Sequence, residues 1–142
     1  MRYLALVLAS AVFSARVLAD DAFVKPPKEA KSREELIQIF GVSRGCGSVQ
    51  RAEFSQFGKK ILAVWYDPFS GRAACYLHAY YYDPQKAAWM LFIDRIIEGA
   101  SDLSAEMPSG RDVLVIRDSN AKVLLEEALA KFPAEKWWDQ KK

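Results

Sequence analysis

The chain has 142 residues, of which 51% are hydrophobic and 13% are aromatic. This composition supports one hydrophobic core and excludes a chain that is disordered along most of its length. The formal net charge is only +2, and the charged residues are scattered along the sequence. Such a balance lacks the basic field that binds nucleic acid or an anionic membrane surface, so it excludes both classes of partner.

Residues 1–19 have the pattern of a secretory signal peptide. One basic residue precedes an apolar run over residues 3–13, which is too short to span a bilayer. Val17 and Ala19 then occupy the third-last and last positions of a cleavage site before Asp20. We therefore expect a mature chain that begins at Asp20, is secreted or periplasmic, and does not insert into a membrane after cleavage.

Cleavage also changes the charge balance. It removes Arg2 and Arg16 from the 20 basic residues and leaves 18 against 18 acidic ones, so the mature chain is formally neutral. The alternative for residues 1–19 is a buried first helix or a membrane anchor. That alternative does not explain why charged, proline-containing sequence follows at once.

Cys46 and Cys75 are the two cysteines of the chain, and both remain after cleavage. In an oxidising compartment a disulfide between them is the expected state. Closing a loop of about 30 residues would stabilise the fold by roughly 3 to 4 kcal/mol in the chain-entropy model. The alternative is that one of the two acts as a nucleophile or a metal ligand.

The segment 20–31 is polar and contains two adjacent prolines, which predicts an extended arm. A short helix over residues 33–40 is predicted next, because Ser32 and Glu35 form a capping box and Gly41 follows the last apolar residue. In that box the side chain of Glu35 is expected to reach back to the amide of Ser32.

From residue 49 the sequence alternates in the manner of strands separated by turns, which predicts an antiparallel meander. Gly58 with Lys59 and Asp83 with Pro84 fit two of the turns. About five to six strands are expected, at residues 49–57, 60–66, 73–82, 87–97, 103–107 and 112–117.

A C-terminal helix is predicted after Asp118, Ser119 or Asn120, each of which could cap it, and Pro133 would end it. The charged tail 134–142 contains two tryptophans, which either pack back onto the domain or contact a partner. The apolar residues at helical spacing are Ala121, Leu124, Leu125, Ala128, Leu129 and Phe132.

These elements predict a single α+β domain over residues 32–133. Its antiparallel meander would carry the short N-terminal helix and the C-terminal helix, packed on the sheet.

His78 is the one histidine of the chain and the first candidate for acid–base chemistry. It lies three residues after Cys75 in a predicted strand, so a regular strand places the two side chains on opposite faces and disfavours a dyad. The sequence has no Gly-x-Ser-x-Gly, His-Glu-x-x-His or calcium-loop pattern. It therefore favours a protein without catalysis, cofactor or metal.

The predicted register sorts residues 60–97 into two faces. The face expected to form the core contains Ile61, Ala63, Trp65, Cys75, Leu77, Ala79, Tyr81, Met90 and Phe92. The second face combines aromatic rings with polar tips, which is typical of a binding surface unless a helix covers it. Its residues are Leu62, Val64, Tyr66, Tyr76, His78, Tyr80, Tyr82, Trp89, Leu91 and Ile93, with Arg51, Glu53 and Ser55 beside them.

The leading hypothesis is an exported noncatalytic protein that recognises a protein or cell-envelope partner, with inhibition of a secreted enzyme as one form of such recognition. One alternative is a carrier of a small apolar or aromatic ligand held between sheet and helix. Another is a small secreted enzyme that uses His78. The candidate binding residues are Tyr76, His78, Tyr80, Tyr82, Trp89, Trp137 and Trp138.

Overall fold

The computed structural model describes residues 25–41, 49–67, 73–100 and 102–134. The expected signal peptide, Cys46, Trp137 and Trp138 lie outside these ranges, so the predictions made for them stay predictions. Among the described residues, no helix is long and apolar enough to cross a membrane.

The described part of the chain forms one short helix and eight strands, arranged in two antiparallel sheets. The first sheet has the order β1-β5-β4-β3-β2, and the second has the order β6-β7-β8. The elements are β1 (Glu29–Ala30), α2 (Arg33–Phe40), β2 (Gln50–Gln56), β3 (Lys59–Tyr66), β4 (Ala74–Asp83), β5 (Ala88–Glu98), β6 (Ser104–Glu106), β7 (Val113–Arg117) and β8 (Val123–Ala128).

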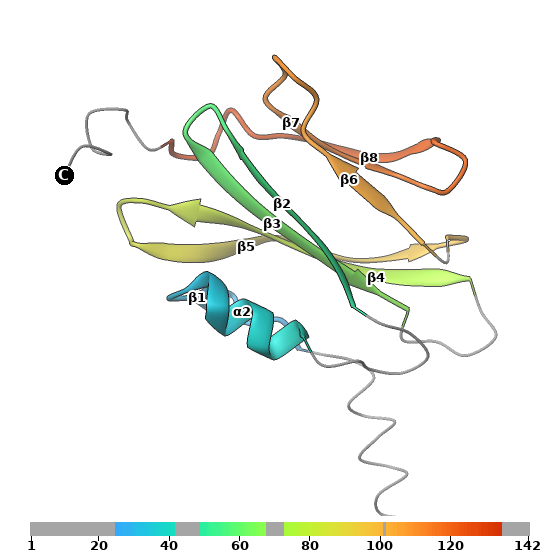
Figure 1. The fold of residues 1–142 in the computed structure, drawn as a ribbon, viewed down its shortest axis with the longest axis horizontal. Helices are drawn as coiled ribbons and strands as arrows, with labels where there is room; N and C mark the ends of the chain where they lie inside the picture. The colour runs from blue at the N-terminus through green and yellow to red at the C-terminus, as the bar shows by residue number, and fades with distance from the viewer. Residues whose placement is uncertain (1–24, 42–48, 68–72, 101, 135–142) are drawn as a thin grey trace, which may run out of the picture.

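The three layers of the fold are visible in Figure 1, with α2 on one side of the five-stranded sheet and β6 to β8 on the other. The middle strands β3 and β4 are buried along almost their whole length. Runs of consecutive apolar residues are typical of strands that are covered on both faces. The single meander expected from the sequence is therefore two sheets, with the larger one in the centre.

The core between the two sheets is apolar and comes from both of them. Trp65 and Leu77 of the large sheet face Leu114 and Ile116 of the small one, and all four are buried. Burial of such side chains stabilises a fold by roughly 1.5 to 3 kcal/mol each. Every residue assigned to the core face from the sequence, except Met90, belongs to this core or packs against it.

A buried polar contact also joins the two sheets. The ammonium group of Lys59, at the start of β3, binds the carboxylate of Asp112 and donates to the carbonyl of Leu129 at 2.7 Å. The side chain of Lys59 is only 7% exposed. Because a buried charge is costly without its partners, this contact fixes how the small sheet sits on the large one.

Helix α2 has the predicted bounds and the predicted cap. The hydroxyl of Ser32 accepts from the amide of Glu35 at 3.1 Å. The return contact is one residue earlier than expected, because the Glu35 carboxylate accepts from the amide of Lys31, not of Ser32. Gly41 follows the helix since a Cβ there would lie 2.3 Å from the carbonyl oxygen of Ile37.

The first hairpin turn differs by one residue from the prediction. Phe57 and Gly58 form it, both with positive φ, and Gln56 pairs with Lys59. Two positive φ values are characteristic of the turn that matches the twist of a hairpin. The side chains still point to the predicted faces, because moving both partners by one residue preserves which residues share a face. The Asp83 turn is confirmed, with its carboxylate accepting from the amides of Gln85 and Lys86.

A β-bulge changes the face of one predicted residue. Ala79 pairs with Ile93, whereas Tyr80 pairs with Leu91, so Phe92 is an extra residue in β5. Phe92 and Ile93 therefore both pack in the core between the sheets. The prediction that Ile93 lies on the second face was wrong because a regular strand was assumed.

The predicted C-terminal helix is wrong, because this segment is strand β8, which pairs with β7. Asp118 does not cap a helix. Its carboxylate accepts from the amides of Asn120 and Lys122 and forms a tight turn in which Ala121 has a φ of 65°. A register shift between Ile116 and Arg117 then lets the adjacent Leu124 and Leu125 both pack against the core. Because Leu124 and Leu125 are adjacent and both apolar, their spacing in the sequence resembles that of an amphipathic helix.

Substitution by glycine distinguishes this hairpin from a helix. Ala121→Gly is expected to stabilise the protein by about 0.5 to 1 kcal/mol, because alanine is strained at positive φ and glycine is not. The matched control Ala128→Gly, within β8, is expected to destabilise it by a similar amount. Urea unfolding followed by tryptophan fluorescence measures both. Loss of stability in both variants would contradict the hairpin and indicate a helix.

Candidate functional site

The large sheet is covered unevenly on its α2 side. Helix α2 lies over β3 and β4, where Leu62, Val64 and Tyr80 are fully or almost fully buried. Edge strand β2 is not covered in the same way, and two hollows lie between it and the helix. The exposed β2 side chains on this face are Arg51, Glu53 and Ser55.

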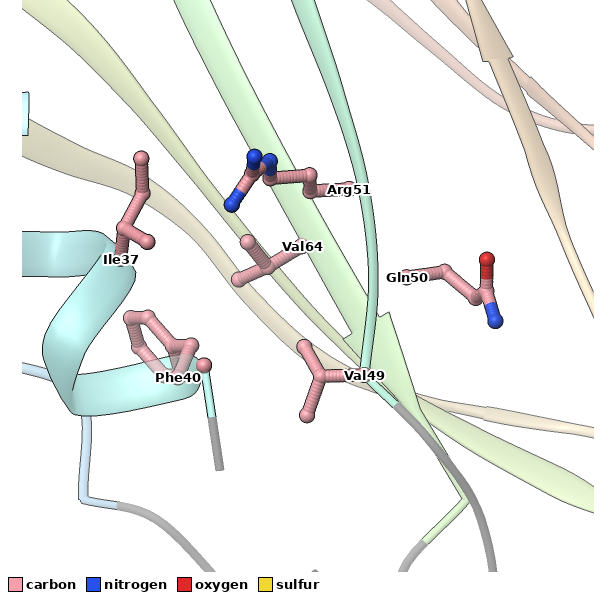
Figure 2. A pocket seen from close by; sticks show the side chains of 7 residues that line it. Ile37, Phe40, Val49, Gln50, Arg51 and Val64 are labelled. Atoms are coloured by element: carbon pink, nitrogen blue, oxygen red, sulfur yellow. The ribbon is translucent and has the colours of Figure 1, made fainter. Parts of the chain in front are cut away.

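The first hollow, which we call the Arg51 hollow, has a volume of about 270 Å³. In Figure 2, Gln50 points away from it, whereas the guanidinium of Arg51 lies on the helix side of β2, toward Ile37. The hollow therefore combines apolar side chains with polar lining atoms and has one cation at its rim. Its lining residues are Ile37, Phe40, Gly41, Val49, Gln50, Arg51 and Val64.

Arg51 has no ion pair with any other residue that the structure describes. Its charge helps to lower the pKa of Glu53, two residues further along β2, but the carboxylate of Glu53 is bound elsewhere. Among the residues that the structure describes, none uses the guanidinium of Arg51 in an ion pair. A planar guanidinium binds a carboxylate best, through two parallel hydrogen bonds.

The ion pair between Arg33 and Glu53 ties the helix to the edge strand. Both Nε and Nη2 of Arg33 donate to the Glu53 carboxylate, the latter at 2.8 Å. Hydrogen bonding from Arg33 holds the pKa of Glu53 below its ordinary value and keeps the carboxylate charged. The pair lies at the surface, so its contribution to stability is small, and it links α2 to β2 without being the main source of their packing.

The second hollow, which we call the Tyr82 hollow, lies at the N-terminal end of α2 and has a volume of about 500 Å³. The rings of Tyr82 and Trp89 meet edge to face at 5.5 Å, and the Lys60 ammonium lies 5.4 Å from the Tyr82 ring centre. This hollow combines aromatic surface with paired charges. Its lining residues are Ser32, Arg33, Glu34, Glu53, Phe54, Ser55, Lys60, Ile61, Tyr82 and Trp89.

Two of the binding residues predicted from the sequence, Tyr82 and Trp89, line this hollow. His78 and Tyr80 are fully buried beneath the helix, and Tyr76 is half-buried beside His78. The hydroxyl of Tyr80 donates to the carbonyl of Pro27 at 2.8 Å. The helix thus covers the centre of the predicted binding face, and the two hollows lie along the side of the helix that faces β2.

His78 is the centre of a buried polar cluster. Its Nε2 lies 3.2 Å from the hydroxyl of Tyr66, and its ring stacks on Phe40 with centroids 5.1 Å apart. The carboxylate of Asp94 lies 3.3 Å from Nδ1, but Nδ1 has no well-formed hydrogen bond to a described residue. Burial lowers the pKa of His78 to about 4, and the negative charge of Asp94 opposes that shift only in part.

Asp94, His78 and Tyr66 lie in a row and have the composition of a proton relay. Tyr66 and His78 are buried, however, so a substrate does not reach them. Burial raises the pKa of Tyr76 beside it to about 12, with Asp94 adding to the rise, so this hydroxyl stays protonated at neutral pH. Tyr66 is only 1% exposed and His78 is 0% exposed. A substrate cannot reach either group while α2 is in place, so the geometry favours a structural role for the cluster.

Cys75 is buried in the core between the sheets. Burial raises the pKa of its thiol to about 11, which makes the thiol a poor nucleophile at neutral pH. Its predicted disulfide partner, Cys46, lies outside the described residues, so the disulfide stays a prediction.

Sequence reasoning placed Arg51, Glu53 and Ser55 beside the aromatic face, and the structure agrees. It placed Val64 of β3 on this face but did not find the rest of the apolar lining of the Arg51 hollow, which comes from α2 and from Val49 just before β2. Only the amphipathic pattern of α2 could have indicated the part that comes from the helix. That pattern shows which helix residues turn inward but not which part of the sheet they meet.

No family model, no curated protein and no solved structure matches this chain. Within the described ranges, no group of three or more His, Cys, Asp or Glu side chains is arranged to hold a metal ion. The candidate site is therefore defined by geometry alone, as two hollows between α2 and β2.

Acid is expected to destabilise the protein through His78. The folded-state pKa of about 4 lies below the ordinary value of 6.5, so the unfolded chain binds the proton more readily. The contribution of the neutral ring is complete above pH 6.5 and is lost as the pH falls toward 4, to a limit of about 3 kcal/mol. His78→Gln is expected to show a flatter fall over this window in urea unfolding. Equal slopes for the variant and the parent protein would contradict the assignment.

Proposed function

We propose that the chain is an exported noncatalytic binding protein that recognises a protein or cell-envelope partner through the two hollows between α2 and β2. The observation that carries the proposal is their position and lining: apolar or aromatic walls, next to charged side chains, on an exposed flank of the domain. This combination is typical of recognition surfaces. Inhibition of a secreted enzyme is one form that such recognition would take.

The surroundings of the hollows support binding more than catalysis. The only histidine of the chain is enclosed beneath α2, so neither hollow has an imidazole at its surface. Ser32 and Ser55 line the Tyr82 hollow, but Ser32 is engaged as the helix cap.

A second candidate function is that of a carrier for a small apolar or aromatic ligand. The position of the Arg51 hollow, between the helix and the sheet, supports this candidate. Its volume of about 270 Å³ lies just below the range of about 300 to 1,000 Å³ for small-molecule pockets, so it suits only a ligand of few atoms.

Site-specific photo-crosslinking tests the proposed surface. A photoreactive residue at Ser55, exposed on β2 beside the Tyr82 hollow, is expected to capture a single partner in the native extracellular or periplasmic compartment. The matched control is the same residue at Ser104, which is exposed on β6 in the opposite layer. Capture from Ser104 and none from Ser55 would place the binding surface on the small sheet and overturn the proposal.

Intact mass tests the compartment and the disulfide together. Protein purified from its native compartment is expected to begin at Asp20, to gain no alkyl group when unfolded without reductant, and to gain two after reduction. A chain that begins at Met1, or that is alkylated at both cysteines without reduction, would contradict export into an oxidising compartment.

A further inference from the structure

We infer that the Arg51 hollow receives the C-terminal residue of a partner polypeptide, with its apolar side chain inside and its α-carboxylate on Arg51. The inference rests on the proposed function and names the group that the partner supplies. In Figure 2 the guanidinium of Arg51 lies beside the apolar side chains of Ile37, Phe40 and Val64, and it forms no ion pair within the described ranges.

The size and lining of the hollow define the apolar part of the ligand. Ile37 and Phe40 form one wall from the helix, and Val64 of β3 and Val49, just before β2, form the other. A space of about 270 Å³ accepts one medium or large side chain, such as that of leucine or phenylalanine, with room at its mouth. Enclosing such a side chain removes apolar surface from water and therefore favours binding.

The charges around the hollow define the polar part. Arg51 is without an acidic partner among the described residues, and Glu53 is already bound by Arg33. The last turn of α2 contains no basic residue, and the C-terminal end of a helix carries partial negative charge. An anion would be repelled from the inner end and attracted at the rim. The ligand therefore places its carboxylate outward on Arg51 and its apolar group inward.

The edge of the sheet indicates that this carboxylate ends a polypeptide. β2 runs from the Arg51 hollow toward the Tyr82 hollow, and its outer edge pairs with no other described strand. A peptide can add to such an edge through main-chain hydrogen bonds. Antiparallel pairing with β2 would bring its C-terminus to Arg51. From Arg51 to Ser55 the strand spans about 13 Å, so a peptide of four or five residues reaches both hollows.

A peptide set with matched end groups tests the inference. The probes are acetylated hexapeptides that end in Leu, Val, Phe or Ala, each made as the free acid and as the C-terminal amide. Binding to the mature chain is measured by titration calorimetry. We expect at least one Leu, Val or Phe peptide to bind as the free acid, and its amide to bind about tenfold or more weakly, because a charge-assisted pair is lost. The Ala peptides are expected to bind more weakly than the large apolar ones.

Two protein variants separate Arg51 from general charge effects. Arg51→Gln is expected to weaken binding of the free-acid peptide to the affinity of the amide peptide and to leave binding of the amide peptide unchanged. Arg95→Gln removes an exposed arginine from β5 and is expected to change the affinity of neither peptide. Because both side chains are exposed, both variants should fold, and equal unfolding midpoints verify this.

The outcomes distinguish this inference from the proposed function. Equal binding of acid and amide, or no binding by any peptide, overturns the C-terminal carboxylate, while capture through Ser55 can still succeed. Binding of N-acetyl-leucine as tightly as the peptides overturns the polypeptide and indicates a small carboxylic acid instead. Loss of capture at Ser55 with retained peptide binding overturns the broader partner surface alone.

Discussion

The burial of β3 and β4 on both faces is the constraint on which the rest of the structure depends. Strands without a solvated face need a cover on each side. The small sheet covers one face through an apolar core, and the contact of Lys59 with Asp112 holds the two sheets in place. Helix α2 covers the other face, where Leu36 and Phe40 meet Leu62 and Tyr80.

The candidate site results from a difference between the two faces of the large sheet, because α2 covers less of its face than the small sheet covers of the other. A single eight-residue helix cannot cover a five-stranded sheet, so α2 lies over the central strands and β2 is left exposed at the edge. The ion pair of Arg33 with Glu53 links the helix to this edge, and the hollows lie along it. The same cover encloses His78, which converts the most obvious catalytic candidate into part of the core.

Local signals in the sequence predicted the parts of the fold that depend on neighbouring residues. The cap of α2 and the turn at Asp83 have the expected residues and contacts, because side chains bond to amides two or three positions away. Alternation assigned the faces of β3 and β4 correctly. It failed for Ile93, and helical spacing wrongly indicated a helix at Leu124 and Leu125, because bulges place adjacent residues on one face and break the period that identifies a strand.

The sequence by itself determined the α2 boundary, the core face of the central strands and the aromatic character of the opposite face. It also identified Tyr82 and Trp89 as binding candidates, and both line a hollow. Only the tertiary structure decided that the last segment is a strand and that α2 lies over His78 and Tyr80. It alone brought Phe40 and Arg51 to one hollow. The reason is that periodicity records which side a residue faces, whereas a pocket depends on which distant element meets that side.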